Sequence, residues 1–112
     1  MTKEALFQYA KKQYGTEPEY LCERDPDAAV LRHKSGKWYA VFMRIEKQKL
    51  GLAGDGMIDI MDVKCDSQMA SFILQSYGIF PDYHMNKKHW ITILLDDFIS
   101  EVQTLDFLGY EL

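Results

Sequence analysis

The amino-acid sequence predicts a single-domain α+β protein in which an antiparallel β-sheet packs against about three helices. The chain has 112 residues, which is the commonest size for one domain, so we expect one domain over 1–112. Runs of strand-forming residues are separated by short turns, which is typical of β-hairpins and therefore of antiparallel pairing. Apolar residues also recur at helical spacing at both ends of the chain. The 47% hydrophobic content is enough to form a core without disulfides or a structural metal.

The first predicted helix begins after Thr2 and ends at Gly15. The Thr2 hydroxyl can accept a hydrogen bond from the first helical turn, and Gly15 can adopt the left-handed conformation that ends a helix. The next stretch contains the proline segments 17–19 and 25–27. Proline lacks an N–H donor and restricts the residue before it, so we predict a loop over this acidic stretch.

A β-hairpin is predicted from strands at Ala29–His33 and Lys37–Ile45, joined by a short turn at 34–36. The run from Trp38 to Met43 is apolar on both alternating faces of the strand. Such a pattern indicates a central strand that is covered on both sides.

The second half of the chain predicts a further reversal and two more helices. Glycines at 51–56 tolerate the positive φ angles of a turn and precede a strand-like run. Asp66 can cap a helix, and the spacing of Ser100 and Gln103 is typical of a capping box. The remaining predicted elements are a strand over 57–63, a helix over 66–78, a loop at Pro81, a strand over 89–95 and a helix over 100–108.

Charge is distributed unevenly along the chain. The formal net charge is −4, which argues against a generally basic surface for nucleic acid. Residues 30–50, however, carry six basic residues against Glu46 alone, a formal +5, whereas the stretch from Asp96 onward carries five acids and no basic residue, a formal −5. The sequence therefore predicts a molecule with two electrically different sides.

Cysteine usage and hydropathy indicate a soluble, cytoplasmic protein. Cys22 and Cys65 lie far apart and form no C-x-x-C pair, so we expect two free thiols in a reducing compartment. The N-terminus has no apolar signal core, and no stretch has the roughly 18 apolar residues of a membrane span. We therefore expect no membrane association.

The segment 86–96 resembles the asparagine-lysine-x-histidine-tryptophan signature of the MmcQ/YjbR family, with Asn86, Lys87, His89 and Trp90 at the matching positions. Other segments resemble the family in the same order along the chain, and together they cover nearly all of it. These segments are the hairpin at 36–40, the strand-to-helix junction at 63–66, the loop at 78–85 and the terminal helix at 110–112. The resemblance implies a frataxin-like, double-wing α+β fold and a family often described as DNA-binding. It implies no catalytic residue set and no iron chemistry.

The basic hairpin is the strongest local indication of nucleic-acid binding. β-Ribbons enter grooves, and lysine and arginine contacts to phosphate give affinity that does not depend on sequence. The equally favoured alternative is a solvated, charged hairpin that balances acidic surfaces, including those of a homodimer partner. A protein-interaction module is a further hypothesis, and a small-ligand protein or unrecognised enzyme with a pocket between sheet and helices is another. The candidate nucleic-acid contacts are Arg32, Lys34, Lys37, Arg44, Lys47, Lys49, Lys87 and Lys88.

The sequence nominates no enzyme, metal or cofactor site. His84 and His89, with Cys65 or Asp82, have no compact ligand spacing, so we expect no metal. No nucleophile elbow or triad spacing occurs, so we expect a protein that is not an enzyme and needs no cofactor. We also expect Trp90 to pack beneath the terminal helix as a core residue, in preference to a base-stacking role for Trp90 and His89.

Two carboxylates on the predicted strand 57–63 look like an acid–base pair. Asp59 and Asp62, however, are separated by an odd number of positions, which directs them to opposite faces of a strand. We therefore do not expect them to act together.

Overall fold

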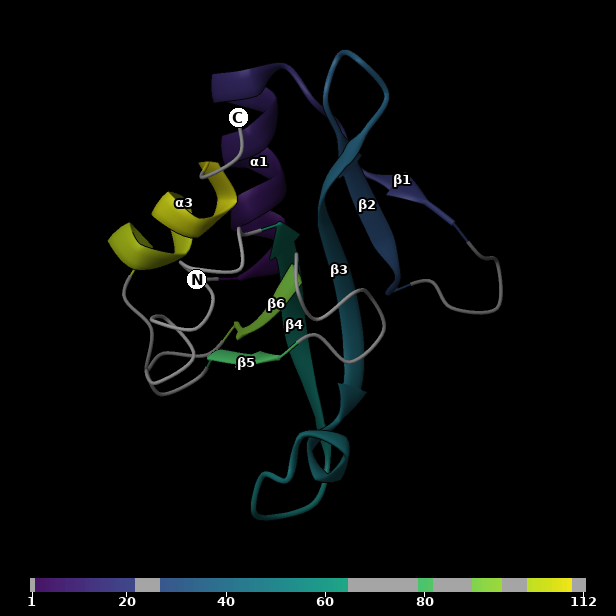
Figure 1. The fold of residues 1–112 in the computed structure, drawn as a ribbon, viewed down its shortest axis with the longest axis vertical. Coiled ribbons are helices and arrows are strands. Elements are labelled where there is room, and N and C mark those ends of the chain that lie inside the picture. The colour runs from purple at the N-terminus through teal and green to yellow at the C-terminus, as the bar shows by residue number, and fades with distance from the viewer. Residues whose placement is uncertain (1, 22–26, 65–78, 82–89, 96–100, 110–112) are drawn as a thin grey trace.

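A six-stranded antiparallel sheet in the order β1-β2-β3-β4-β6-β5 lies at the centre of the described structure (Figure 1). The computed structural model describes residues 2–21, 27–64, 79–81, 90–95 and 101–109. The strands are β1 (Glu19–Tyr20), β2 (Ala29–Arg32), β3 (Trp38–Glu46), β4 (Met57–Lys64), β5 (Ile79–Pro81) and β6 (Trp90–Leu94). The α+β class predicted from the sequence is confirmed.

Two α-helices and one 3₁₀ turn accompany the sheet in these residues. The helices are α1 (Lys3–Tyr14) and α3 (Glu101–Gly109), and the 3₁₀ turn is η1 (Lys47–Leu50). The predicted helix over 66–78 and the capping residue Ser100 lie outside the described residues. None of the helices that are described is long and apolar enough to cross a membrane.

The ends of α1 are those predicted from the sequence. The Thr2 hydroxyl accepts a hydrogen bond from the backbone N–H of Ala5 at 3.2 Å, and Gly15 ends the helix with φ 67°. The Gly15 N–H donates to the carbonyl oxygen of Lys11 at 3.1 Å. A side chain at this position would be strained, because L residues rarely adopt positive φ.

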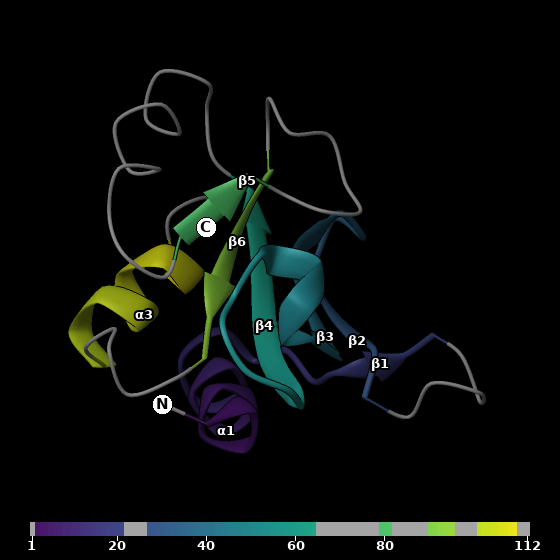
Figure 2. The same cartoon turned by 90° about the horizontal axis from the view of Figure 1, so that it is seen from below.

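Both helices lie on one side of the sheet (Figure 2). Leu6 and Ala10 of α1 and Leu108 of α3 pack into one buried cluster with alternate residues of the strands. The strand residues of this cluster are Leu31, Tyr39, Ala40, Phe42, Met61, Val63, Ile79, Ile91 and Ile93. This side of the sheet is the main core.

The opposite side of the sheet is also buried. Val30, Val41 and Trp90 form one cluster there, and Ile45, Ile60 and Leu94 form a second. Leu50 of η1 and Leu52 of the following turn pack against the second cluster. The central strand β3 is therefore covered on both sides, as its apolar run predicts.

Trp90 is buried as expected, but the predicted location beneath the terminal helix is wrong. Its side chain is 6% exposed and packs with Val30 and Val41, on the side of the sheet away from α1 and α3. The cause is strand parity, because Ile91 and Ile93 of β6 take the positions that face the helices.

The prediction of loops at two edge segments is wrong. Glu19 and Tyr20 pair with Val30 and Ala29 and form β1, although proline precedes them. Pro81 closes the edge strand β5, where it faces Ile91 of β6. Proline is tolerated at a sheet edge, because its missing N–H would have no ladder partner there. Pairing with a neighbouring strand, rather than local propensity, accounts for both strands.

A β-bulge interrupts the hairpin of β2 and β3. Leu31 faces Ala40 and Arg32 faces Trp38, so Tyr39 is an extra residue on β3. Tyr39 and Ala40 consequently both join the cluster on the helix side, whereas Trp38 lies on the other side. The bulge directs the Tyr39 ring toward the end of α1.

Candidate functional site

The basic residues of the 30–50 segment are divided between two ends of the sheet (Figure 1). Lys34 and Lys37 lie at the β2–β3 turn, and Lys47 and Lys49 lie in η1 after the far end of β3. Lys47 lies ten positions after Lys37, which is about 30 Å along an extended strand. The six predicted contacts therefore do not form one surface.

The two arginines of this segment lie on opposite faces of the sheet and are already paired. Arg32 Nε lies 2.9 Å from a carboxylate oxygen of Glu19, and its guanidinium lies 5.9 Å from the centroid of the Trp38 ring. Arg44 lies 3.6 Å from Asp59, its cross-strand neighbour on β4. The parity argument for Asp59 is confirmed, because Asp62 is fully buried on the other face.

The end of α1 and the β2–β3 turn lie at the same end of the sheet (Figure 1). Lys11 and Lys12 occupy the last turn of α1, and both are exposed. Lys34 and Lys37 are exposed on the neighbouring turn and make no ion pair in the part of the chain that the structure describes. We call these four lysines the basic end. Sequence reasoning missed Lys11 and Lys12, because no local pattern shows that the end of a helix and a distant hairpin turn lie at the same end of a sheet.

A polar pocket of about 360 Å³ lies within the basic end. The segment that follows α1 lines one side of the pocket, and the β2–β3 hairpin lines the other. Glu17 forms an ion pair with Lys11 at 3.1 Å. The ion pair of Glu19 with Arg32 also lies at the pocket. Its lining residues are Gly15, Thr16, Glu17, Glu19, Arg32, His33, Lys34 and Gly36.

The wall of this pocket is held in place by Tyr39. The hydroxyl oxygens of Tyr39 and Thr16 lie 2.6 Å apart, and the ring of His33 packs on the ring of Tyr39 with centroids 4.8 Å apart. Burial raises the pKa of Tyr39 above its ordinary value of 10.0, and the hydrogen bond with Thr16 opposes this effect. The Tyr39 hydroxyl therefore stays protonated at neutral pH and acts as a structural link.

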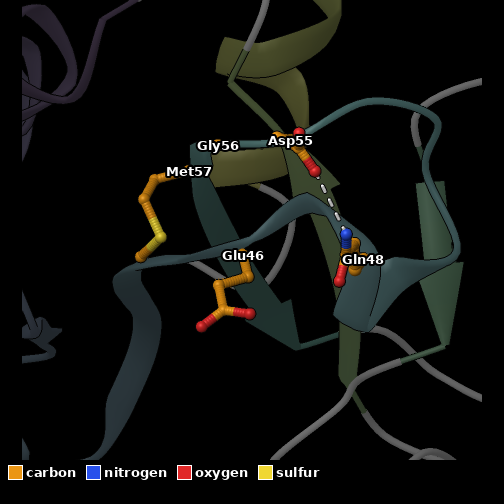
Figure 3. Close-up of a pocket in the computed structure, with 5 residues that line it drawn as sticks. All are labelled: Glu46, Gln48, Asp55, Gly56 and Met57. Carbon is orange, nitrogen blue, oxygen red and sulfur yellow. Dashed lines mark hydrogen bonds between the residues drawn. The ribbon is translucent and has the colours of Figure 1, made fainter.

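The opposite end of β3 carries a second pocket, of about 270 Å³ (Figure 3). It is lined by Glu46, Gln48, Asp55, Gly56 and Met57. The Gln48 amide donates to the Asp55 carboxylate at 3.3 Å across the turn. The carboxylates of Glu46 and Asp55 offset the charges of Lys47 and Lys49, so this end has no net positive charge.

Most of the signature residues lie outside the described residues. The residues outside the described ranges include Asn86, Lys87, Lys88 and His89. They also include His84, Cys65 and Asp82, the residues considered above as metal ligands. Trp90 is described, and Lys64 Nζ lies 5.6 Å from the centroid of its ring. Within the described ranges no group of three or more histidine, cysteine or acidic residues could hold a metal ion.

Comparison with known proteins gives matches over most of the chain. The family model described as YjbR matches residues 11–108. The Bacillus subtilis protein named "Uncharacterized protein YyaQ" is 43% identical over 97 residues, which cover 86% of this chain and 82% of that protein.

Solved structures share the fold. A crystal structure of a Pseudomonas syringae protein is 38% identical, with a TM-score of 0.92 over 96% of this chain and 93% of that chain. A Deinococcus radiodurans protein has a TM-score of 0.70 at 21% identity, over 96% of this chain and 72% of that chain, which shows likeness of fold alone.

Proposed function

This chain belongs to the YjbR family, and we propose that it is a nucleic-acid-binding module without catalytic activity whose contact surface is the basic end. The observation that supports the proposal is that four exposed lysines, Lys11 and Lys12 in the last turn of α1 and Lys34 and Lys37 at the β2–β3 turn, lie at the same end of the sheet (Figure 1). Mobile lysine cations on a fixed framework suit phosphate contacts, because each contact releases counterions from the nucleic acid.

The hairpin turn gives these cations a rigid support. The N–H of His33 donates to the carbonyl of Lys37 at 2.8 Å, and the N–H of Gly36 donates to the carbonyl of His33 at 2.9 Å. Gly36 has φ 91°, which glycine adopts without strain. The backbone positions of Lys34 and Lys37 are therefore fixed, and little backbone ordering is required when a ligand binds.

The experiment is an anisotropy titration of labelled oligonucleotides with wild-type protein and two charge-reversed variants. One variant carries Lys34→Glu and Lys37→Glu, and the matched control carries Lys47→Glu and Lys49→Glu at the other end of β3. We expect the first variant to lose affinity by at least about tenfold at roughly 50 mM salt and the control to change by about twofold or less.

Two results would overturn the proposal. Wild-type protein that binds neither duplex DNA, single-stranded DNA nor RNA at low salt would exclude it. Equal losses in the two variants would show that overall charge, and not the basic end, determines binding.

A second candidate function is protein interaction through the edge strand β1. Tyr20 is 59% exposed and Leu21 is 48% exposed, which are high values for large apolar residues. An edge strand also presents unpaired backbone groups that another strand can use. Light scattering would detect a homodimer, and Tyr20→Lys should return it to a monomer. A wild-type monomer at all concentrations would exclude self-association.

The proposal also includes the detailed fold type and the cellular location of the protein. We propose the frataxin-like, double-wing arrangement that the family resemblance implies, supported by an antiparallel sheet with α1 and α3 on one side. A cytoplasmic location is supported by two cysteines without a pairing motif.

A further inference from the structure

The pocket in the basic end has the size of a small-ligand site. Its volume of about 360 Å³ lies in the lower part of the range of roughly 300–1,000 Å³ for such sites. One wall contains the ring of His33, which the buried Tyr39 supports from behind. The hydrogen bond of Tyr39 with Thr16 fixes the opposite wall, at the end of α1. Both walls of the pocket are therefore held by contacts within the chain.

The charges in the pocket are mixed, although the surface around it is positive. The carboxylates of Glu17 and Glu19 lie among the lysines, and each side chain is more than half exposed. Each ion pair described for them uses one carboxylate oxygen, and an ionised carboxylate has about four acceptor positions. Acceptor positions at the pocket therefore remain for a ligand that donates hydrogen bonds.

A duplex does not match this arrangement. The carboxylates of Glu17 and Glu19 repel its phosphates, and the amino groups of its paired bases are reached only from within the grooves, so no base of a duplex can enter a pocket. A single strand can place phosphates on the lysines and turn one base out of its stack. The exocyclic amino group of such a base is a donor, and carboxylates accept hydrogen bonds from cytosine amino groups.

We propose that the nucleic acid bound at the basic end is single-stranded, and that one unstacked, amino-bearing base enters the pocket and donates to Glu19. This inference rests on the proposed function. Glu19 is the better placed carboxylate, because the pairing of β1 with β2 and its contact with Arg32 fix its position. The ring of His33 provides an aromatic surface for the base. Thymine is a poor fit, since its one ring N–H lies between two carbonyl oxygens.

The experiment compares three labelled ligands, each about twelve nucleotides long, within the usual range of single-strand site sizes. The ligands are oligo-dC, oligo-dT and a mixed-sequence duplex, titrated with the full-length protein. We expect both single strands to bind at least about tenfold more tightly than the duplex, and oligo-dC to bind more tightly than oligo-dT.

The variant Glu19→Gln tests the role of the carboxylate. It should reduce the ratio of oligo-dC to oligo-dT affinity by about fivefold or more, because the amide can donate to thymine as well as accept from cytosine. The matched control is Glu46→Gln, which makes the same change of charge at the second pocket (Figure 3) and should leave the ratio unchanged. Thermal melting checks that both variants are folded.

Several results would overturn the inference and leave the proposed function intact. One is a duplex that binds as tightly as the single strands. Another is a Glu19→Gln variant that binds every ligand more tightly by the same factor, since the carboxylate would then only repel phosphate. Absence of all nucleic-acid binding would instead reject the proposed function itself. Binding of cytidine monophosphate without binding of any oligonucleotide would reject both and indicate a small-ligand protein.

Discussion

The hydroxyl oxygens of Thr16 and Tyr39 lie 2.6 Å apart and join the end of α1 to the bulge of β3. Tyr39 is 1% exposed, and its ring also supports His33 at the pocket. The contact thus holds the segment that follows α1 against the bulge of β3 at the pocket. Changes at Tyr39 should alter stability and, through the pocket wall, ligand binding.

The Tyr39→Phe variant should be less stable at neutral pH by about 1 kcal/mol, the value of one lost hydrogen bond. It should also be less sensitive to alkali. Burial raises the pKa of Tyr39 in the folded state above 10.0, so the folded state holds the phenolic proton more strongly than the unfolded state. That stabilisation is complete below pH 10.0 and is lost as the pH rises through the raised pKa.

The measurement for Tyr39 is chemical denaturation at a series of pH values from neutral to strongly alkaline. The control is Tyr20→Phe, which removes a phenol that is 59% exposed and should keep the alkaline dependence of the wild type. Burial raises the pKa of Tyr14 as well, so part of the alkaline loss should remain in Tyr39→Phe. An unchanged alkaline dependence in Tyr39→Phe would contradict the prediction.

Thr92→Val should destabilise the fold by about 1–3 kcal/mol, because it removes a donor to a buried carboxyl group. The Thr92 hydroxyl donates to Asp62 Oδ1 at 2.6 Å, between neighbouring residues of β6 and β4, and both residues are fully buried. Thr92→Ser keeps the hydroxyl and is the matched control, with a smaller loss from one deleted methyl group. Equal stability of the valine variant and the wild type, by urea denaturation, would show that the hydrogen bond contributes nothing.

Trp90→Ala should destabilise the fold by about 3–5 kcal/mol through the loss of buried aromatic contacts. Its ring is 6% exposed and packs with Val30 and Val41. Thermal melting measures the effect, and Trp90→Phe should recover part of it. A normal melting temperature together with weaker nucleic-acid binding would instead make Trp90 a ligand-contacting residue.

Affinity for nucleic acid should fall steeply as salt concentration rises. If the four lysines of the basic end each neutralise one phosphate, the slope of log affinity against log salt is near −3.6 on a duplex and −2.8 on a single strand. Raising salt from roughly 50 to 200 mM should then weaken binding by about a hundredfold or about fiftyfold, respectively. The Lys34→Glu, Lys37→Glu variant should have a flatter slope. Affinity that does not change with salt would show that phosphate contacts do not carry binding.

The sequence by itself determined the elements whose signals are local. The Thr2 and Gly15 caps set the limits of α1, and the apolar run of 38–43 identified β3 as a central strand covered on both sides. The parity of Asp59 and Asp62 was also correct, because alternation along a strand is a property of the extended backbone. Capping, turn chemistry and periodicity each depend on residues that are close in the chain.

Only the tertiary structure decided which residues meet. The edge strands β1 and β5 exist through pairing with β2 and β6, which no local pattern reports. The six cations counted as one basic segment are divided between the two ends of β3, whereas the packing of α1 against the sheet places Lys11 and Lys12 at the same end of the sheet as the β2–β3 turn (Figure 1). A count of charges along the sequence groups residues by their separation along the chain. Contact with a ligand depends on distance in space, and here the extended backbone of β3 and the close packing of α1 make those two quantities different.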